Sequence, residues 1–492
     1  MKNFPKIAII CICLLFIAIF TSACGSSKTT PPQPSPYWLL TQNNNQQENN
    51  NQQENNNQQE NNNQQENNNQ QENNNQQENN NQQENNNQQE GNNEEEPIIE
   101  EGNLILTDSL NADKIATADI FYSVGDNTKS SDDKEILKAK PNADNKTKFK
   151  LPDNIDIPNT KIKAIITYDS TGKCLDYFSS YNGVESKNNA FNVNFENSNG
   201  DFAGGEGTAE KPYLISQPRH FFNINKQDAQ GKYLYLDKSF QQKEDIDFSH
   251  LTGLKIVSAT DDKDITVEKT NEKAPFYNDG HGINSIGVLG DVNTTEAHKY
   301  SFKGNYNGNN KTIDGIMFVN PDTQYISLFP GFTGSYLKNI TIGTNSIIYI
   351  DGISDKDYLC IGIFLTYEKN DNVTMSFENC VNNCKIILKN SKNINTLCLA
   401  GLTVMDTHEI SYANCTNNGN ISIIGNEIQC INVAGCSVNY AGQTDGGASY
   451  INNYVNNGII KIANNKSNGN SSTINVSGLY LDSIKEYNSS GF

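Results

Sequence analysis

The chain has 492 residues and a formal net charge of −20, and this length suits two or three domains rather than one. Arginine occurs only once, at Arg219. Because proteins bind nucleic acids by neutralising phosphates with clustered Lys and Arg, an acidic chain without such clusters is a poor candidate for a nucleic-acid partner.

The N-terminus predicts an export signal. Lys2 and Lys6 form a short positive head, and residues 7–20 are apolar. That run is too short for an ordinary membrane span and has the length of a signal-peptide core. We therefore assign residues 1–23 to a cleaved signal peptide.

Small residues lead into a cysteine in the run Thr21-Ser22-Ala23-Cys24-Gly25. This run resembles a bacterial lipoprotein signal, although Thr21 stands where that family usually has Leu. The resemblance implies cleavage before Cys24 and a diacylglycerol on its thiol, so that Cys24 anchors the chain in a membrane. Gly25 after the cysteine implies export to the outer membrane in a double-membrane bacterium. The alternative is an ordinary secretory signal that ends near a cysteine.

Residues 24–96 predict a disordered stalk. The hexamer NNNQQE repeats eight times between Asn43 and Glu90 and contains no apolar residue. Nothing in these repeats can offset the entropy lost on ordering, and no coiled-coil seam is present. As a random coil the stalk spans roughly 45–50 Å on average, and fully extended it reaches about 240 Å.

Residues 97–198 predict a β-sandwich of immunoglobulin-like or transthyretin-like type. About six short β-prone runs occur there, and Asp169-Ser170-Thr171-Gly172 forms a hairpin turn with Gly where positive φ is needed. The runs are residues 103–106, 115–123, 148–151, 161–168, 173–178 and 190–195.

Residues 199–492 contain an internal repeat. The run Asn379 to Ile387 recurs from Asn414 to Ser422 and again from Asn453 to Lys461. A second motif with a central glycine follows each copy, at Gly401, Gly435 and Gly478, with an earlier copy at Gly362. Each repeat of about 34 to 43 residues holds short β-prone runs separated by Asn/Gly corners.

Such repeats predict a parallel, right-handed β-helix. Each rung buries one face of its strands against its neighbours, and Asn or Gly supplies the left-handed backbone of the corners. Recurrent asparagines predict ladders of hydrogen-bonded amides along the axis. Two rungs per repeat would fit the period, and ten to thirteen rungs would give a rod of roughly 50–60 Å. Helical arrays are disfavoured, since the runs lack a 3.6-residue period.

The start of this region resembles bacterial surface β-helix proteins with GLUG-type repeats. The residues that carry the resemblance are the opening Phe202–Thr208 and Pro212–Ile215, the strand Asp245-Ile246-Asp247, the spaced set Phe302, Gly304, Gly308 and Ile313, and the rung Leu337–Ile342. The resemblance covers about 280 residues. It implies an adhesin-like surface protein or the non-catalytic part of a larger secreted protein.

No pattern points to catalysis, a cofactor or a metal. His408-Glu409 begins like a zinc motif, but Tyr412 replaces the second histidine, and the remaining histidines have no ligand spacing. His220 is expected to be a packed or surface residue. The run Asp261 to Asp264 has the spacing of a solvated loop. We expect no enzyme activity, although β-helices also host polysaccharide lyases and hydrolases.

The cysteines favour stacked, buried thiols, and the sequence does not decide whether any of them pair. Cys174 is alone in the sandwich, and Cys380 and Cys415 occupy equivalent repeat positions. With two rungs between them, at about 9–10 Å, these two thiols could not bridge. An odd number of cysteines lies in the repeat region: Cys360, Cys380, Cys384, Cys398, Cys415, Cys430 and Cys436.

Together these features predict a lipid-anchored protein of the cell envelope, displayed on the outer membrane, with the solenoid binding a host or cell-surface glycan or protein. A structural envelope component without a ligand is the alternative. A polysaccharide-degrading β-helix enzyme is the less favoured third interpretation.

Overall fold

The computed structural model describes residues 103–125, 135–290, 299–366, 375–404, 410–438, 450–466 and 473–481. The predicted signal peptide, Cys24 and the stalk lie outside these residues, as do His408 and Glu409. The described part is all-β, with one six-residue helix, α3 (Pro218–Asn223), and five short 3-10 turns. None of its helices has the length and apolar character that a membrane crossing requires.

Two small sheets form the N-terminal region. Antiparallel neighbours make a four-stranded sheet in the order β3-β2-β5-β6, and a three-stranded sheet has the order β4-β1-β7. Their strands are β1 (Asn103–Thr107), β2 (Thr117–Val124), β3 (Glu135–Ala139), β4 (Lys148–Lys150), β5 (Thr160–Tyr168), β6 (Cys174–Glu185) and β7 (Ala190–Asn194).

Side chains from both small sheets share one core that includes Leu104, Ile120, Ile165 and Phe191. All six predicted strands are present, and β3 is the one that the sequence did not reveal. The predicted turn joins β5 to β6, where Gly172 has a φ of 79°.

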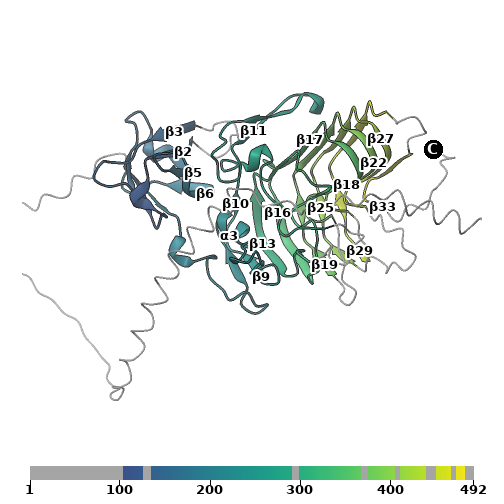
Figure 1. Cartoon of the computed structure of the whole chain (residues 1–492), viewed down its shortest axis with the longest axis horizontal. Coiled ribbons are helices and arrows are strands. Elements are labelled where there is room, and N and C mark those ends of the chain that lie inside the picture. Colours follow the sequence, from purple (N-terminus) through teal and green to yellow (C-terminus); the bar gives the residue numbers. More distant parts are fainter. Residues whose placement is uncertain are drawn as a thin grey trace, which may run out of the picture. The chain divides into compact units, whose positions relative to one another are not determined.

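Parallel strands of successive coils build the solenoid (Figure 1). The first sheet begins with β8 (Tyr213–Ile215), β9 (Ser239–Gln242) and β10 (Ile246–Asp247), and continues through β13 (Asn305–Asp314), β16 (Tyr336–Ile342), β19 (Met375–Glu378), β24 (Ile410–Ala413) and β29 (Tyr450–Asn452). Its short companions are β20 (Val381–Asn382), β25 (Thr416–Asn417) and β30 (Val455–Asn456).

Three further stacks complete each turn. The second sheet contains β14 (Met317–Val319), β17 (Ile347–Asp351), β21 (Lys385–Lys389), β26 (Ile421–Ile424) and β31 (Ile460–Ala463). The third contains β15 (Tyr325–Ile326), β18 (Ser354–Gly362), β22 (Lys392–Ala400), β27 (Ile428–Ala434) and β32 (Thr473–Ser477). A small fourth sheet contains β23 (Thr403–Val404), β28 (Ser437–Val438) and β33 (Tyr480–Leu481).

Each repeat makes one coil, so the expectation of two rungs per repeat was wrong. Ile386 pairs directly with Ile421, and Leu397 pairs directly with Ile431. A single repeat supplies strands to each sheet in turn, so its full length completes one turn around the axis. The seven strands from β8 to β29 in the path of the first sheet therefore stack over roughly 30 Å, about half of the predicted height.

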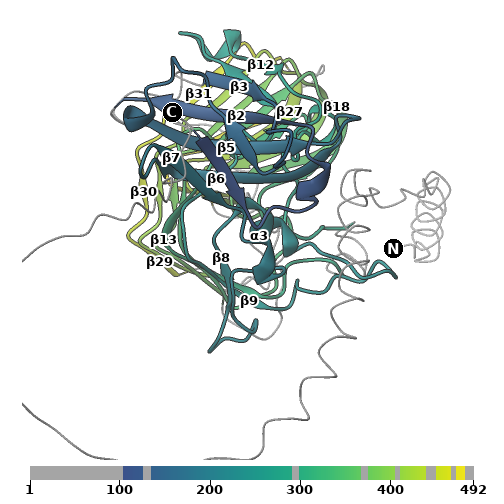
Figure 2. The ribbon, with the colours of Figure 1, turned by 90° about the vertical axis from the view of Figure 1, so that its left-hand side faces the viewer.

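One continuous core runs through the coils. Aromatic side chains follow one another along it in edge-on and tilted contacts, with ring centroids 5.2 Å apart for Phe364 and Phe377, 5.8 Å for Phe377 and Tyr412, and 5.1 Å for Tyr412 and Tyr454. Figure 2 looks along these coils from the N-terminal side. Helix α3 closes this end of the core, where Phe221 is fully buried and Phe222 nearly so.

The cysteine columns also differ from the expected spacing. Val381 pairs with Thr416, which places Cys380 and Cys415 on adjacent coils, and Cys360 pairs in register with Cys398. The expected separation of 9–10 Å was therefore wrong. The described cysteines are nevertheless all free thiols, and burial raises the pKa of Cys384 and Cys436 far above the usual range of a thiol.

We expect the buried thiols to resist alkylation in the native protein, because the thiolate is the reactive form. Cys380, Cys384 and Cys415 should react with N-ethylmaleimide at least about 100-fold more slowly than the half-exposed Cys430. Peptide mapping by mass spectrometry measures each site separately, and unfolding in guanidinium should equalise the rates. Native rates equal to that of Cys430 would contradict the packing.

Candidate functional site

The outer face of the second sheet is covered. Strands β11 (Leu254–Val257) and β12 (Thr266–Lys269) form an antiparallel hairpin whose connection is the acidic run Asp261 to Asp264. Asp262 accepts from the Lys385 ammonium at 3.1 Å, and Asp261 from that of Lys461 at 2.9 Å. Lys263 and Asp264 are exposed, as expected of a solvated loop, but the sequence did not reveal that Asp261 and Asp262 pair with lysines on separate coils.

Apolar contacts reinforce this cover. Ile166 and Tyr168 on β5, Leu254 and Ile265 on the hairpin, and Tyr349 on β17 belong to one buried cluster. The Lys389 ammonium lies beneath the hairpin and donates to the carbonyl oxygens of Lys263, at 3.0 Å, and Ile265, at 2.7 Å. The hairpin and the N-terminal sheets therefore cover the outer face of β14, β17 and β21.

Arg219 joins the two regions of the fold. Its guanidinium lies 3.3 Å from the Asp176 carboxylate on β6 and donates to the Asn197 side chain and to the Phe195 carbonyl oxygen. Both charged side chains are at least nine-tenths buried. Burial raises the pKa of Asp176, and the neighbouring Arg219 opposes that rise. The chain's single arginine thus forms a structural ion pair with Asp176. No sequence motif revealed this pair.

His220, next to it on α3, is a packed histidine. Its side chain is fully buried, and Nδ1 accepts from the Ser216 amide at 3.3 Å. The neutral ring then carries its proton on Nε2, which has no hydrogen-bond partner among the described residues. Burial, together with the positive charges of Arg219 and Lys243, lowers the pKa of His220 to about 3.

We expect acid to destabilise the fold through His220. His220 is protonated near pH 6.5 in the unfolded chain, but only near pH 3 in the folded chain. Stability contributed by the neutral ring is therefore complete above pH 6.5 and falls by about 1.4 kcal/mol per pH unit below it. Urea unfolding between pH 4 and 7 measures this slope, and His220→Gln should flatten it by about one proton. An unchanged slope in the variant would contradict the assignment.

The first sheet presents a different outer surface, which we call the ladder face. Its central column is a five-member asparagine ladder in which the Nδ2 of each residue donates to the Oδ1 of the residue one coil earlier. These bonds measure 2.9 Å (Asn339 to Asn307), 3.0 Å (Asn379 to Asn339), 3.2 Å (Asn414 to Asn379) and 3.0 Å (Asn453 to Asn414). The predicted amide ladders are therefore confirmed.

Local backbone geometry explains why asparagine occupies this column. The last four members have φ between 51° and 58°, a left-handed region that asparagine tolerates better than most residues. Glycine serves another corner by allowing close approach, since a Cβ on Gly419 would lie 1.9 Å from the Cys384 carbonyl oxygen. The backbone geometry of the corners thus explains why asparagine and glycine recur there.

Two more ladders flank this column. Asn382, Asn417 and Asn456 form an inner ladder with bonds of 2.8 and 2.9 Å, in which Asn382 and Asn417 are fully buried. The residues that follow them, Asn383, Asn418 and Asn457, form an outer ladder with bonds of 2.9 and 2.8 Å. The outer ladder and the central column border a stripe of small side chains: Thr341, Val381, Thr416 and Val455.

The ladder face suits a neutral, polar ligand. In the exposed amides of Asn414 and Asn418, the ladder bonds use one N–H and one oxygen lone pair, which leaves another of each for a ligand. The amides recur about every 4.8 Å along the axis. At its border, Lys338 lies 4.3 Å from the Tyr336 ring centroid. Rows of amides and small side chains can bind hydroxyl or peptide groups, but they offer no nucleophile or general base.

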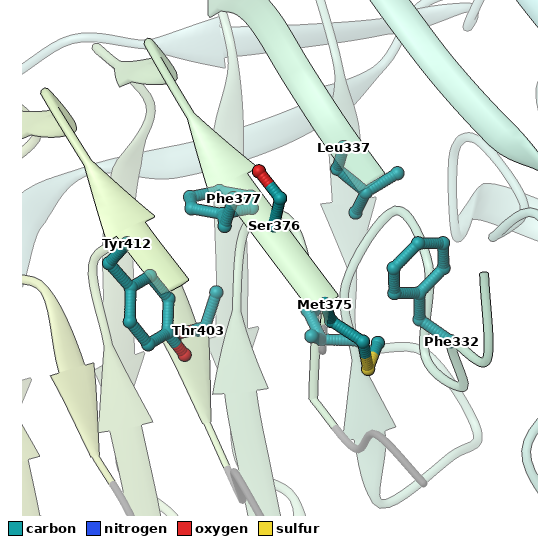
Figure 3. A pocket seen from close by; sticks show the side chains of 8 residues that line it. Phe332, Leu337, Met375, Ser376, Phe377, Thr403 and Tyr412 are labelled. Atoms are coloured by element: carbon teal, nitrogen blue, oxygen red, sulfur yellow. Dashed lines mark hydrogen bonds between the residues drawn. The ribbon is translucent and has the colours of Figure 1, made fainter. Parts of the chain in front are cut away.

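One small cavity lies in the described interior of the solenoid. A cavity of about 10 Å³ lies between Phe332, Leu337, Met375, Phe377 and Tyr412 (Figure 3), with room for about one water molecule. Thr403 borders it and lies 3.1 Å from the Tyr412 hydroxyl and 2.8 Å from that of Ser437.

Titratable groups do not gather into a metal centre in the described part of the chain, where no three His, Cys, Asp or Glu side chains are placed to hold an ion. The buried Asp314 accepts from the amides of Gly315 and Asn345 and from the Asn345 side chain. Burial raises the pKa of Asp314. Its hydrogen bonds tie neighbouring coils together.

No protein-family model matches the chain, and no curated protein matches it. Among solved structures, the chain is similar to one from Bacteroides ovatus described as a "putative immunoglobulin A1 protease". The identity is 16%, the TM-score is 0.25, and the match covers 58% of this chain and 88% of that one. A likeness at this TM-score carries no argument about fold or activity.

Proposed function

We propose that the protein is a surface-displayed lipoprotein that binds a host or cell-surface ligand in the manner of an adhesin. Residues 1–23 are removed, Cys24 carries the lipid in the outer membrane, and residues 24–96 form the stalk. The N-terminal sheets are an immunoglobulin-like or transthyretin-like module, and the solenoid is a right-handed β-helix of the GLUG type.

The observation that carries the proposal is the contrast between two faces of the solenoid. The hairpin and the N-terminal sheets bury the outer face of the second sheet. On the ladder face, Asn414, Asn418 and Asn457 are exposed, and no described segment packs over them. A row of neutral amides suits the hydroxyl groups of a glycan or the backbone of a protein, and an acidic chain without basic clusters disfavours nucleic acid.

Binding tests the ladder face directly. Thr416→Arg combined with Asn418→Arg should reduce binding of the protein to host cells or to a glycan array at least about tenfold, because two long charged side chains obstruct the face. Asn395→Arg combined with Gln429→Arg, on exposed positions of the third sheet, is the matched control. Equal losses in both double variants, or no binding by the wild type, would refute the assignment.

Anchoring is tested separately. In cells fed an alkyne-tagged fatty acid, the wild type should acquire the label and Cys24→Ala should lose it. Protease added to intact cells should release the solenoid if the protein is displayed outward. Unlabelled wild type, or a solenoid that stays protected, would refute the anchor or the display, respectively.

A structural envelope component without a ligand is the second candidate. It is favoured by ladder amides that bond chiefly to one another and to the backbone. Deleting the gene would then weaken the envelope against detergent and leave attachment to host surfaces unchanged. A polysaccharide-degrading activity is a weaker alternative, and release of reducing or unsaturated ends from glycans would reveal it.

A further inference from the structure

The last described coil leaves core positions uncovered. Ile431 and Val433 on β27 are fully buried, whereas Ile474 and Val476, which pair with them on β32, are 48% and 52% exposed. Leu479, just before β33, is 44% exposed. Ile474 and Val476 continue the core columns of Ile431 and Val433, and no described residue covers them.

The same coil presents unpaired strand edges. Each strand from β29 to β33 pairs with its counterpart one coil earlier and, within the described residues, with no strand beyond it. Proteins usually protect such edges with charges, bulges or a cap, because an open edge templates pairing with another strand. The opposite end of the stack is closed by α3 and its phenylalanines.

Charge does not block this open end. Residues 450–466 and 473–481 contain Lys461 and Lys466 and no carboxylate, and Lys461 is paired with Asp261. In a chain of net charge −20, an end face without carboxylates meets little repulsion from an identical face.

We propose that the open end binds a second copy of the same chain, end to end about a twofold axis. Only the C-terminal ends can meet, since α3 closes the other end, and such an interface uses the same surface on both copies. Edges related by the twofold axis would pair antiparallel, and Ile474, Val476 and Leu479 would be buried. The inference rests on the fold and is independent of the lipid anchor and of any host ligand.

The available area is sufficient for a stable dimer. Asn307 and Asn339 occupy equivalent positions 32 residues apart, so one coil has a perimeter of roughly 105 Å. A closed outline of that length encloses roughly 550–900 Å² per copy, which is comparable to a standard specific interface.

Sedimentation velocity of the exported full chain tests the pairing, with Cys24→Ala so that no acyl chain contributes. We expect a reversible dimer at micromolar concentration. Ile474→Lys with Val476→Lys should weaken it at least about 100-fold, because four like charges would meet in the interface. Val124→Lys with Ile136→Lys, at exposed apolar positions of the N-terminal sheets, should leave the dimer unchanged.

Hydrogen exchange provides a second readout that needs no variant. Amides of β32 and β33 should become protected as the wild-type concentration rises. A wild type that stays monomeric at 100 μM would overturn the proposal. If deletion of residues 482–492 then produced a dimer, the chain's own C-terminal segment would be the occupant. A dimer that survives the two lysines would place the contact elsewhere and would also overturn it.

Discussion

Replacing Asn417 by alanine is expected to destabilise the solenoid by about 3–4 kcal/mol. The buried Asn417 side chain accepts from Asn382 at 2.8 Å and from the Gly419 amide at 3.1 Å, and it donates to Asn456 at 2.9 Å and to the Gly419 carbonyl oxygen at 3.0 Å. Truncation removes all four bonds and leaves buried polar groups without their partners.

The matched control is Asn418→Ala, one position along the chain. Asn418 belongs to the exposed outer ladder, where water can replace the lost partner, so its removal should cost at most about 1 kcal/mol. Urea unfolding monitored by circular dichroism compares the two variants. Equal losses would show that the burial of the inner ladder does not matter.

Replacing Arg219 by methionine should cost about 3–5 kcal/mol. The substitution leaves Asp176 buried without its cation, although the carboxylate keeps the amides of Leu110 and Tyr177 and the side chain of Asn197 as donors. Because the pair joins β6 to α3, we expect the variant to open between the two regions and to be cut faster by protease at residues 199–212.

A compensating variant separates charge from packing. Asp176→Leu combined with Arg219→Met removes both charges, and it should recover more than half of the loss because a hydrophobic pair can replace a buried ion pair. The double variant should also regain protease resistance. A double variant no more stable than Arg219→Met would show that the packing or hydrogen bonds of Arg219, rather than the uncompensated charge, carry the effect.

The local features of this fold were predictable from the sequence. Alternating β-prone runs located six of the seven N-terminal strands, because alternation reflects burial of one face of a sheet. The asparagine columns were also predictable, since equivalent positions on adjacent coils must lie one above another. The turn at Gly172 follows from its requirement for positive φ.

Features that depend on long-range contacts were not predictable. The number of coils per repeat depends on how many strands surround the axis, and the repeat period alone does not give it. The ion pairs of the acidic run from Asp261 were not predictable, because the partners Lys385 and Lys461 lie more than 120 residues later in the chain. Arg219 carried no motif, and its partner Asp176 lies in the other region of the fold.

The match between one repeat and one coil has a consequence for how this protein can change in length. Deleting residues 379–413 would join Glu378 to Asn414, an equivalent position, and would shorten the stack by one coil, about 4.8 Å. Every amide column could then close again across the junction. A deletion of ten residues inside a coil would instead shift all later columns out of line. Unequal recombination between these repeats should therefore produce folded variants that differ in length by whole coils.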